Sequence, residues 1–231
     1  MSLLEIACFN TKSALLAQAN GASRIELCAE QSLGGVTPPL SDFISLKSSL
    51  VIPINVMIRP RGGDFVYSTT EMRQMKREIE SFGGEGVDGF VFGVLTAEGK
   101  IDRDACRELL ECVEEVGRGG KEMKFTFHRA FDEIPGGEME DSLEELIELG
   151  FTSVLTSGGK KNAFEGKEVL AKLVKRARGR IEIIVGGGVR SGNLEALIEE
   201  TGAGSFHSSA VVGEEDVASD DEVKKLSRFM R

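Results

Sequence analysis

Two histidines are the residues of this chain best suited to chemistry near neutral pH. They are the only histidines among 231 residues, and an imidazole both titrates near neutrality and ligates metals. His128 lies in Thr126-Phe-His-Arg-Ala-Phe-Asp132, and His207 precedes two serines; each ends a short apolar run that is typical of a strand. Because parallel barrels place their chemistry at the strand C-termini, we expect a site at that end of the fold.

Two carboxylates could work with these imidazoles. Glu26 lies within an apolar strand, so side-chain alternation predicts that it faces the barrel interior, where it must be paired or functional. Its alternative role is an ion pair with Arg24 or Arg59. Asp132, four residues after His128, is placed to orient an imidazole for proton transfer, or else caps a turn. The candidate catalytic residues are therefore Glu26, His128, Asp132 and His207.

Anion-binding groups follow the third strand and the last three strands. Arg59 and Arg61 flank a proline in Met57-Ile-Arg-Pro-Arg-Gly-Gly-Asp-Phe65 and predict an anion clamp, because guanidinium forks suit carboxylate and phosphate. The alternative is a loop tied down by Asp64 and helix C-termini. Glycine-rich turns after late strands bind phosphate through backbone N–H groups in many barrels. The further candidate ligand-binding residues are Ser157, Gly158, Gly187, Gly188 and Ser208.

Cys8 and Cys28 end the first two predicted strands. Adjacent strand ends could bring two thiols together around a soft monovalent metal. The alternative is that both thiols are simply buried, as cysteine often is.

The elements that must position these residues alternate along the whole chain. The predicted strands are Leu3–Cys8, Arg24–Cys28, Pro53–Ile58, Gly89–Leu95, Lys124–His128, Ser153–Ser157, Ile181–Val185 and Ser205–Ser209. The predicted helices are Thr11–Asn20, Ser41–Ser49, Thr70–Phe82, Asp102–Val116, Asp141–Leu149, Gly166–Arg178, Gly192–Thr201 and Asp220–Arg231. Eight such units predict one (β/α)8 TIM-barrel domain over residues 1–231, with an open doubly wound sheet as the alternative.

Composition narrows the class of protein. The formal charge is −10, from 28 basic and 38 acidic residues, which argues against nucleic acid as a partner because phosphates need a basic surface. No apolar run approaches the roughly 20 residues that span a bilayer, so no membrane partner is expected. Met1-Ser-Leu-Leu-Glu-Ile enters a strand directly, which predicts no signal peptide, a cytoplasmic location and reduced cysteines.

Six motifs together resemble the CutC family, named for copper homeostasis. They are Arg24-Ile-Glu-Leu-Cys28, Gly34-Gly-Val-Thr-Pro38, Met57 to Phe65 with Tyr67-Ser68, Thr126 to Asp132, Leu155-Thr-Ser-Gly-Gly159 and Phe206-His-Ser-Ser-Ala210. The resemblance covers nearly the whole chain. It implies a (β/α)8 barrel, a cytoplasmic homo-oligomer (dimer or tetramer), and a role in copper tolerance or Cu(I) binding.

The chain departs from that family in two places. Relatives proposed to hold Cu(I) carry a cysteine where this chain has Ala7, whereas Cys28 matches the second cysteine. After Ala210 the chain reaches its last helix by a shorter segment than is usual. Two functions therefore compete: a copper-homeostasis protein that binds Cu(I), or a TIM-barrel enzyme that acts on a small anionic, perhaps phosphorylated, metabolite by acid–base chemistry.

Overall fold

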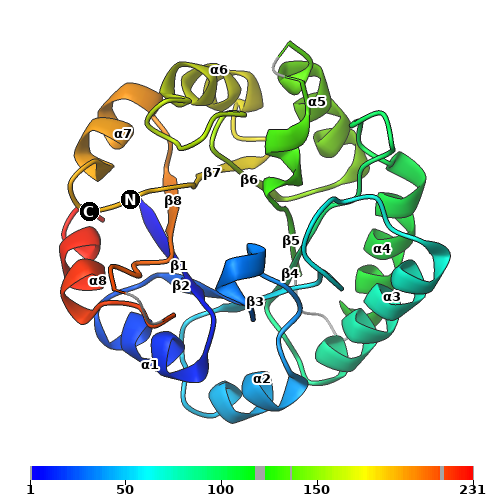
Figure 1. Cartoon of the computed structure of the whole chain (residues 1–231), viewed down its shortest axis with the longest axis horizontal. Helices are drawn as coiled ribbons and strands as arrows, with labels where there is room; N and C mark the ends of the chain where they lie inside the picture. The colour runs from blue at the N-terminus through cyan, green and yellow to red at the C-terminus, as the bar shows by residue number, and fades with distance from the viewer. Residues whose placement is uncertain (1, 118–122, 136, 214–215, 231) are drawn as a thin grey trace.

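Eight parallel strands close into a barrel that is surrounded by eight α-helices (Figure 1). The computed structural model describes residues 2–117, 123–135, 137–213 and 216–230. The strands are β1 (Leu3–Cys8), β2 (Arg24–Leu27), β3 (Ile54–Met57), β4 (Gly89–Phe92), β5 (Lys124–Phe127), β6 (Ser153–Thr156), β7 (Glu182–Val185) and β8 (Ser205–Ser208). The predicted (β/α)8 fold is confirmed, and the open sheet is excluded because β1 pairs with β8 as well as with β2.

The helices follow the strands in strict alternation. They are α1 (Thr11–Ala19), α2 (Leu40–Lys47), α3 (Thr69–Gly84), α4 (Arg103–Val116), α5 (Met139–Leu149), α6 (Lys167–Ala177), α7 (Leu194–Thr201) and α8 (Asp220–Ser227), with short 3₁₀ turns η1 (Gln31–Leu33) and η3 (Arg129–Glu133). Several begin at polar caps, as at Ser68, whose hydroxyl accepts the Glu71 N–H in a capping box. The last helix ends at Ser227, earlier than the predicted Arg231, which lies outside the described residues.

Side-chain alternation divides the barrel wall into two layers. The outward residues, such as Leu4, Ile6 and Cys8 on β1, join one large apolar cluster packed between strands and helices. The inward residues include more polar side chains, such as Glu5 on the same strand and Glu26 on β2. Because successive strand residues point to opposite faces, the same pattern that builds the core also directs charged groups into the barrel.

Candidate functional site

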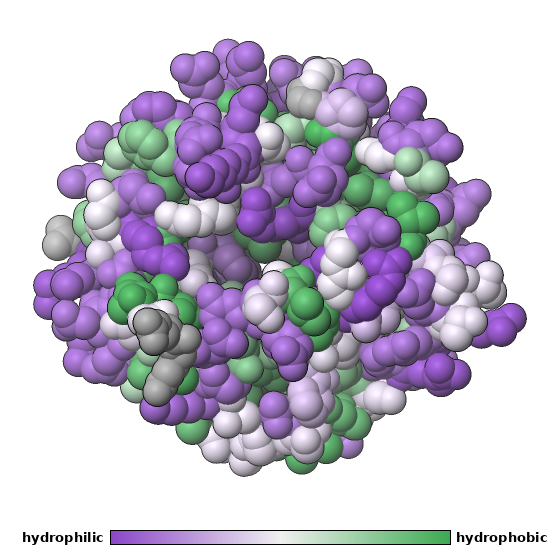
Figure 2. All heavy atoms as spheres, in the orientation of Figure 1, coloured by the Kyte–Doolittle hydropathy of each residue, from purple (hydrophilic) through white to green (hydrophobic). Residues whose placement is uncertain are grey.

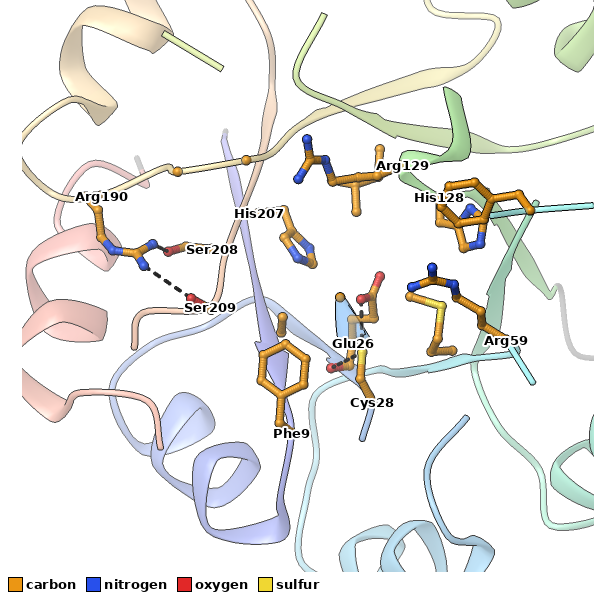
Figure 3. A pocket seen from close by; sticks show the side chains of 17 residues that line it. Phe9, Glu26, Cys28, Arg59, His128, Arg129, Arg190, His207, Ser208 and Ser209 are labelled. Carbon is orange, nitrogen blue, oxygen red and sulfur yellow. Dashed lines mark hydrogen bonds between the residues drawn. The ribbon is translucent and has the colours of Figure 1, made fainter. Parts of the chain in front are cut away.

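A cavity of about 200 Å³ lies at the C-terminal ends of the strands. Figure 2 shows a hollow at the centre of one face of the molecule, with hydrophilic side chains gathered around it. In Figure 3 the side chains that line the cavity come from strand ends far apart in the sequence. Its basic and acidic lining residues are Glu26, Arg59, His128, Arg129, Arg190 and His207.

His128 follows β5 and is held in one tautomer. Its Nδ1 accepts a hydrogen bond from the Ala130 N–H at 3.3 Å, so the neutral ring carries its proton on Nε2. That buried Nε2 has no hydrogen-bond partner in the described part of the chain. Burial and, to a smaller extent, the positive charge of Arg59 lower the pKa of His128 to about 3. The ring is therefore a neutral hydrogen-bond donor beside the cavity at physiological pH.

Arg59 is a buried cation with no carboxylate partner among the described residues. Its Nη atoms donate to the backbone carbonyls of Leu33, Gly35 and Gly63 at 2.8–3.0 Å, and its guanidinium lies 4.6 Å from the Phe65 ring centroid. Its Nε is buried without a partner. The alternative pairing of Arg59 with Glu26 is not among the ion pairs of the described residues, so the charge faces the cavity uncompensated.

Arg61 does not join Arg59 at the cavity. It turns to the surface, where it bonds Glu71 at 2.6 Å and Asp64 at 2.9 Å. The predicted anion clamp of Arg59 and Arg61 is therefore wrong for Arg61. The alternative interpretation, a loop tied down by Asp64, describes this residue. The physical reason is local: the capping-box glutamate of α3 and the loop aspartate offer the guanidinium two carboxylates outside the barrel.

Glu26 and Cys28 both point inward from β2. The Cys28 thiol donates to Glu26 Oε1 at 3.1 Å, while the buried Glu26 Oε2 has no partner among the described residues. Burial raises the pKa of Glu26, although the charge of His207 opposes the shift. Burial and the adjacent Glu26 also raise the pKa of the Cys28 thiol. The free carboxylate oxygen therefore faces the cavity as an acceptor beside a thiol that stays protonated.

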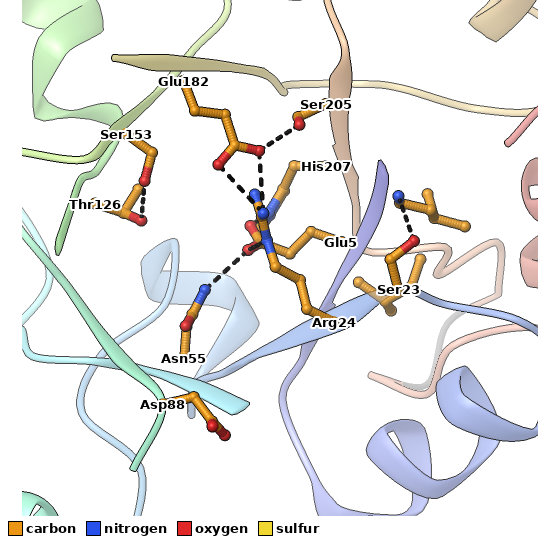
Figure 4. A network of polar contacts seen from close by, with 12 residues as sticks. Glu5, Ser23, Arg24, Asn55, Asp88, Thr126, Ser153, Glu182, Ser205 and His207 are labelled. Atoms are coloured by element: carbon orange, nitrogen blue, oxygen red, sulfur yellow. Dashed lines mark hydrogen bonds and ion pairs between the residues drawn. The ribbon is translucent and has the colours of Figure 1, made fainter. Parts of the chain in front are cut away.

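His207 links the cavity to a polar network deeper in the barrel (Figure 4). Its Nδ1 lies 2.7 Å from Glu5 Oε1, and Glu5 also accepts from Arg24 at 2.6 Å. Arg24 bonds Glu182 at 3.0 Å, so it pairs with these two carboxylates and not with Glu26. Burial alone would lower the pKa of His207, but the charges of Glu26 and Glu5 outweigh it and raise that pKa. The two carboxylates thereby favour the protonated form of His207.

Asp132 does not orient His128 in this structure. Its carboxylate accepts from the Thr156 hydroxyl at 2.5 Å, from backbone N–H groups of Ser157 and Gly159, and from Arg129. The expected acid–base role of Asp132 is therefore replaced by a structural one, which ties η3 to the loop after β6. Arg129, held by Asp132 and Ser157, faces the cavity instead.

The late loops supply the opposite wall of the cavity. Gly187 and Gly188 line it, as do Arg190, Ser208 and Ser209. Arg190 donates to both serine hydroxyls and to two backbone carbonyls, with no carboxylate partner among the residues described. Gly187 is required at its place, because its φ is +92° and a Cβ would lie 3.4 Å from the Arg129 guanidinium carbon. Two candidate residues, Ser157 and Gly158, are outside the cavity lining.

Cys8 and Cys28 do not form a two-thiol site. Cys8 lies in the outward apolar layer and its thiol donates to the Ile6 carbonyl, whereas Cys28 faces the cavity. Ala7, the inward neighbour of Cys8, is the β1 residue that lines the cavity. The expected shared soft-metal site of Cys8 and Cys28 therefore does not match the geometry, because neighbouring strand residues point to opposite faces.

Among the described residues, one group of three side chains has the spacing of metal ligands. Ligand atoms of Glu5, Glu26 and His207 lie within 4.8 Å of one another. A cation there would compete with Arg24, which already bonds Glu5 at 2.6 Å, and with Asn55, which donates to the same carboxylate. Of the three, Glu26 keeps a carboxylate oxygen free for a ligand.

Three functional-site residues were not singled out in the sequence. Arg129 directly follows the candidate His128, and Arg190 lies two residues after the candidate Gly188. Both could have been found in the sequence as charged residues close to a candidate. Glu5 sits in an apolar strand just as Glu26 does, and the same alternation argument finds it.

The fold and the cavity define a (β/α)8-barrel protein with a polar cavity at its strand C-termini. The CutC family model matches residues 2–212. The human copper homeostasis protein cutC homolog is 42% identical over 208 residues, which are 90% of this chain and 73% of that protein. The chain belongs to the CutC family.

Solved structures agree with this assignment. The putative copper homeostasis protein CutC from Streptococcus agalactiae superposes with a TM-score of 0.83 at 34% identity, covering 90% of this chain and 99% of that one. N-(5'-phosphoribosyl)anthranilate isomerase from Pyrococcus furiosus has a TM-score of 0.66 at 13% identity and covers 100% of this chain and 98% of its own. The latter likeness is one of fold alone.

Proposed function

We propose that this CutC family member binds a small metabolite with an anionic group in the strand-end cavity and exchanges a proton with it. One observation carries the proposal. Arg59, His128 and Glu26 are each buried, and each has a hydrogen-bonding atom without a partner in the described part of the chain. Buried polar atoms are nearly always satisfied, so three unsatisfied ones around one cavity indicate a ligand that completes them.

Charge supports an anionic ligand. Arg59 and Arg190 line the cavity without carboxylate partners among the described residues, and Arg129 brings a third guanidinium. A buried charge is costly unless it is paired, so a phosphate or carboxylate would stabilise the arrangement. The cavity is smaller than the roughly 300–1,000 Å³ of drug-sized pockets, which favours a small metabolite.

Thermal unfolding with a panel of small phosphorylated and carboxylated metabolites tests binding. A ligand that binds only the folded chain raises its stability by about 2.7 kcal/mol at a hundred times its Kd, so at least one panel member should raise the Tm in a saturable way. If no panel member shifts the Tm at millimolar concentration, the proposal is wrong.

Cu(I) binding is the second candidate, because relatives are named for copper homeostasis and two sulfur side chains, Cys28 and Met57, pack together at the cavity wall. The raised pKa of Cys28 opposes formation of the thiolate that binds metal, and Ala7 supplies no second thiol. We therefore expect weak Cu(I) binding that Ala7→Cys tightens.

Competition against a Cu(I) chelator decides between the candidates. Tight one-to-one binding by the unmodified chain, lost in Cys28→Ser, would favour the copper function over the metabolite function. Cys8→Ser is the matched control, because that thiol faces the outer layer and its loss should leave Cu(I) binding unchanged.

A cytoplasmic location and a homo-oligomeric state remain part of this proposal. The four cysteines are free and buried, which suits a reducing compartment. Within the described residues, no helix combines the length and apolarity needed to cross a membrane. Cell fractionation and light scattering coupled to size-exclusion chromatography test location and assembly.

A further inference from the structure

We infer that the proton exchanged in this cavity comes from a carbon next to a carbonyl group, on a small ligand that also carries a phosphate or carboxylate. The inference rests on the proposed function and names its substrate class. It follows from three kinds of group that line the cavity (Figure 3). Glu26 offers a carboxylate oxygen, His128 offers a neutral imidazole donor, and the arginines offer positive charge.

The base is Glu26. Its Oε1 is occupied by the Cys28 thiol at 3.1 Å, which fixes the carboxylate and leaves Oε2 as the atom without a partner among the described residues. In Figure 3 this carboxylate extends between His207 and Arg59 into the shared space. A buried carboxylate loses the solvation that stabilises its charge, so it is a stronger base than a carboxylate in solution.

The electrophile is His128. Its Nδ1 is committed to the Ala130 N–H, so Nε2 donates, and a carbonyl oxygen is the acceptor that would satisfy it. The Phe65 ring lies against His128 with a centroid distance of 4.8 Å and a tilt of 58° between the ring planes, and the Arg59 guanidinium lies 4.6 Å from the Phe65 ring centroid. Arg59 therefore adds positive charge beside the atom where an enolate oxygen would become negative, which is where stabilisation speeds such a step.

The remaining cations anchor the ligand. Arg190 and the Gly187–Gly188 turn lie on the β7 and β8 side of the cavity, away from His128 on β5. They are placed to hold the anionic group, while His207, fixed by Glu5 at 2.7 Å, lies beside Glu26. An anchored anion at one end and a polarised carbonyl at the other would set the intervening C–H against Glu26.

The step balances without a further reactant. Glu26 takes the proton, the C–H electron pair becomes a C=C bond, and the carbonyl π pair moves to oxygen. The enolate that forms accepts a hydrogen bond from His128 Nε2. Return of the proton from Glu26 to the same carbon regenerates the ligand. Nothing is oxidised or reduced, and in D₂O the carbon acquires deuterium because the Glu26 proton exchanges with solvent.

Proton NMR in D₂O tests the inference with two probes, dihydroxyacetone phosphate and pyruvate, whose exchangeable C–H groups adjoin a carbonyl. Binding of each probe is measured first by thermal unfolding. A probe that binds should lose its C–H signal at least 100-fold faster with the protein than without it. Glu26→Gln should abolish the acceleration and His128→Gln should reduce it at least tenfold, while both variants still unfold cooperatively.

The control is Glu30→Gln, an exposed carboxylate just after the same strand, which should exchange as fast as the unmodified protein. If a probe binds and its C–H signal persists at the uncatalysed rate, the inference is overturned while the proposed binding function stands. Equal exchange in Glu26→Gln also overturns it. If neither probe binds and no other panel metabolite does, the proposed function itself is wrong, and the inference with it.

Discussion

His207 on the last strand and Glu5 on the first share a hydrogen bond of 2.7 Å across the seam where the barrel closes. The two residues are also register partners in the β1–β8 pairing. The seam therefore joins the fold to the site, because this contact between the first and last strands also orients the cavity residue His207 and raises its pKa. Arg24 and Asn55 hold the same carboxylate from β2 and β3.

Removal of Glu5 should destabilise the fold strongly. Arg24 and His207 hold the pKa of Glu5 at about 2 against the effect of burial, and Glu5→Ala leaves Arg24 and His207 without this partner. A broken buried pair costs on the order of 3–5 kcal/mol in the free energy of unfolding. Urea denaturation measures the loss. Asp221→Ala, which breaks an exposed pair with Lys225, is the control and should cost less than about 1 kcal/mol. Equal losses of unfolding free energy in Glu5→Ala and Asp221→Ala would contradict the conclusion that Glu5 stabilises the barrel at the seam.

Most of the fold follows from the sequence, because helix and strand periodicities alternate and parallel units close most simply into a barrel. The inward placement of Glu26 and His128 follows as well, since alternation along a strand is a backbone property. Thiol placement obeys the same rule, and counting from Ala7 places Cys8 outward.

Partner choice is what the sequence could not supply. Arg61 and Arg59 stand two positions apart in one loop, yet the first bonds Glu71 on the next helix and the second bonds carbonyls over the cavity. Asp132 likewise bonds the loop after β6 rather than His128. These outcomes depend on which donors and acceptors the folded loops bring within reach, and no local periodicity encodes that.

Acid should destabilise the protein through His128. The unfolded chain binds a proton at this ring near pH 6.5, whereas the folded chain binds it only near pH 3. The neutral ring therefore makes its full contribution to the free energy of unfolding above about pH 6.5. This contribution is lost as the pH falls toward 3. Between pH 7 and 5 the expected loss is about 2 kcal/mol. Urea titrations at both pH values should show a smaller loss in His128→Gln; an equal pH dependence in the variant would contradict the buried neutral ring.

Gly93 should tolerate no side chain. A Cβ there would lie 2.7 Å from His128 Nδ1 and 3.0 Å from Phe127 Cζ, so the His128 ring would have to shift from its place. We expect Gly93→Ala to cost about 1–3 kcal/mol of folding stability and to weaken ligand binding by displacing His128. Gly84→Ala is the control, because Gly84 ends α3 and a Cβ there meets no atom within 4 Å. Calorimetric melts should show a lower Tm for Gly93→Ala and no loss of Tm for Gly84→Ala.

The central claim is that Arg59, and not its neighbour Arg61, binds the ligand in the cavity. Isothermal titration of the panel metabolite that stabilises the unmodified chain most tests it directly. Arg59→Lys should weaken binding by at least tenfold, because a charge-assisted hydrogen bond contributes roughly 1.5–3 kcal/mol, and Arg61→Lys should change the Kd less than twofold. An unchanged Kd in a folded Arg59→Lys variant would contradict the account.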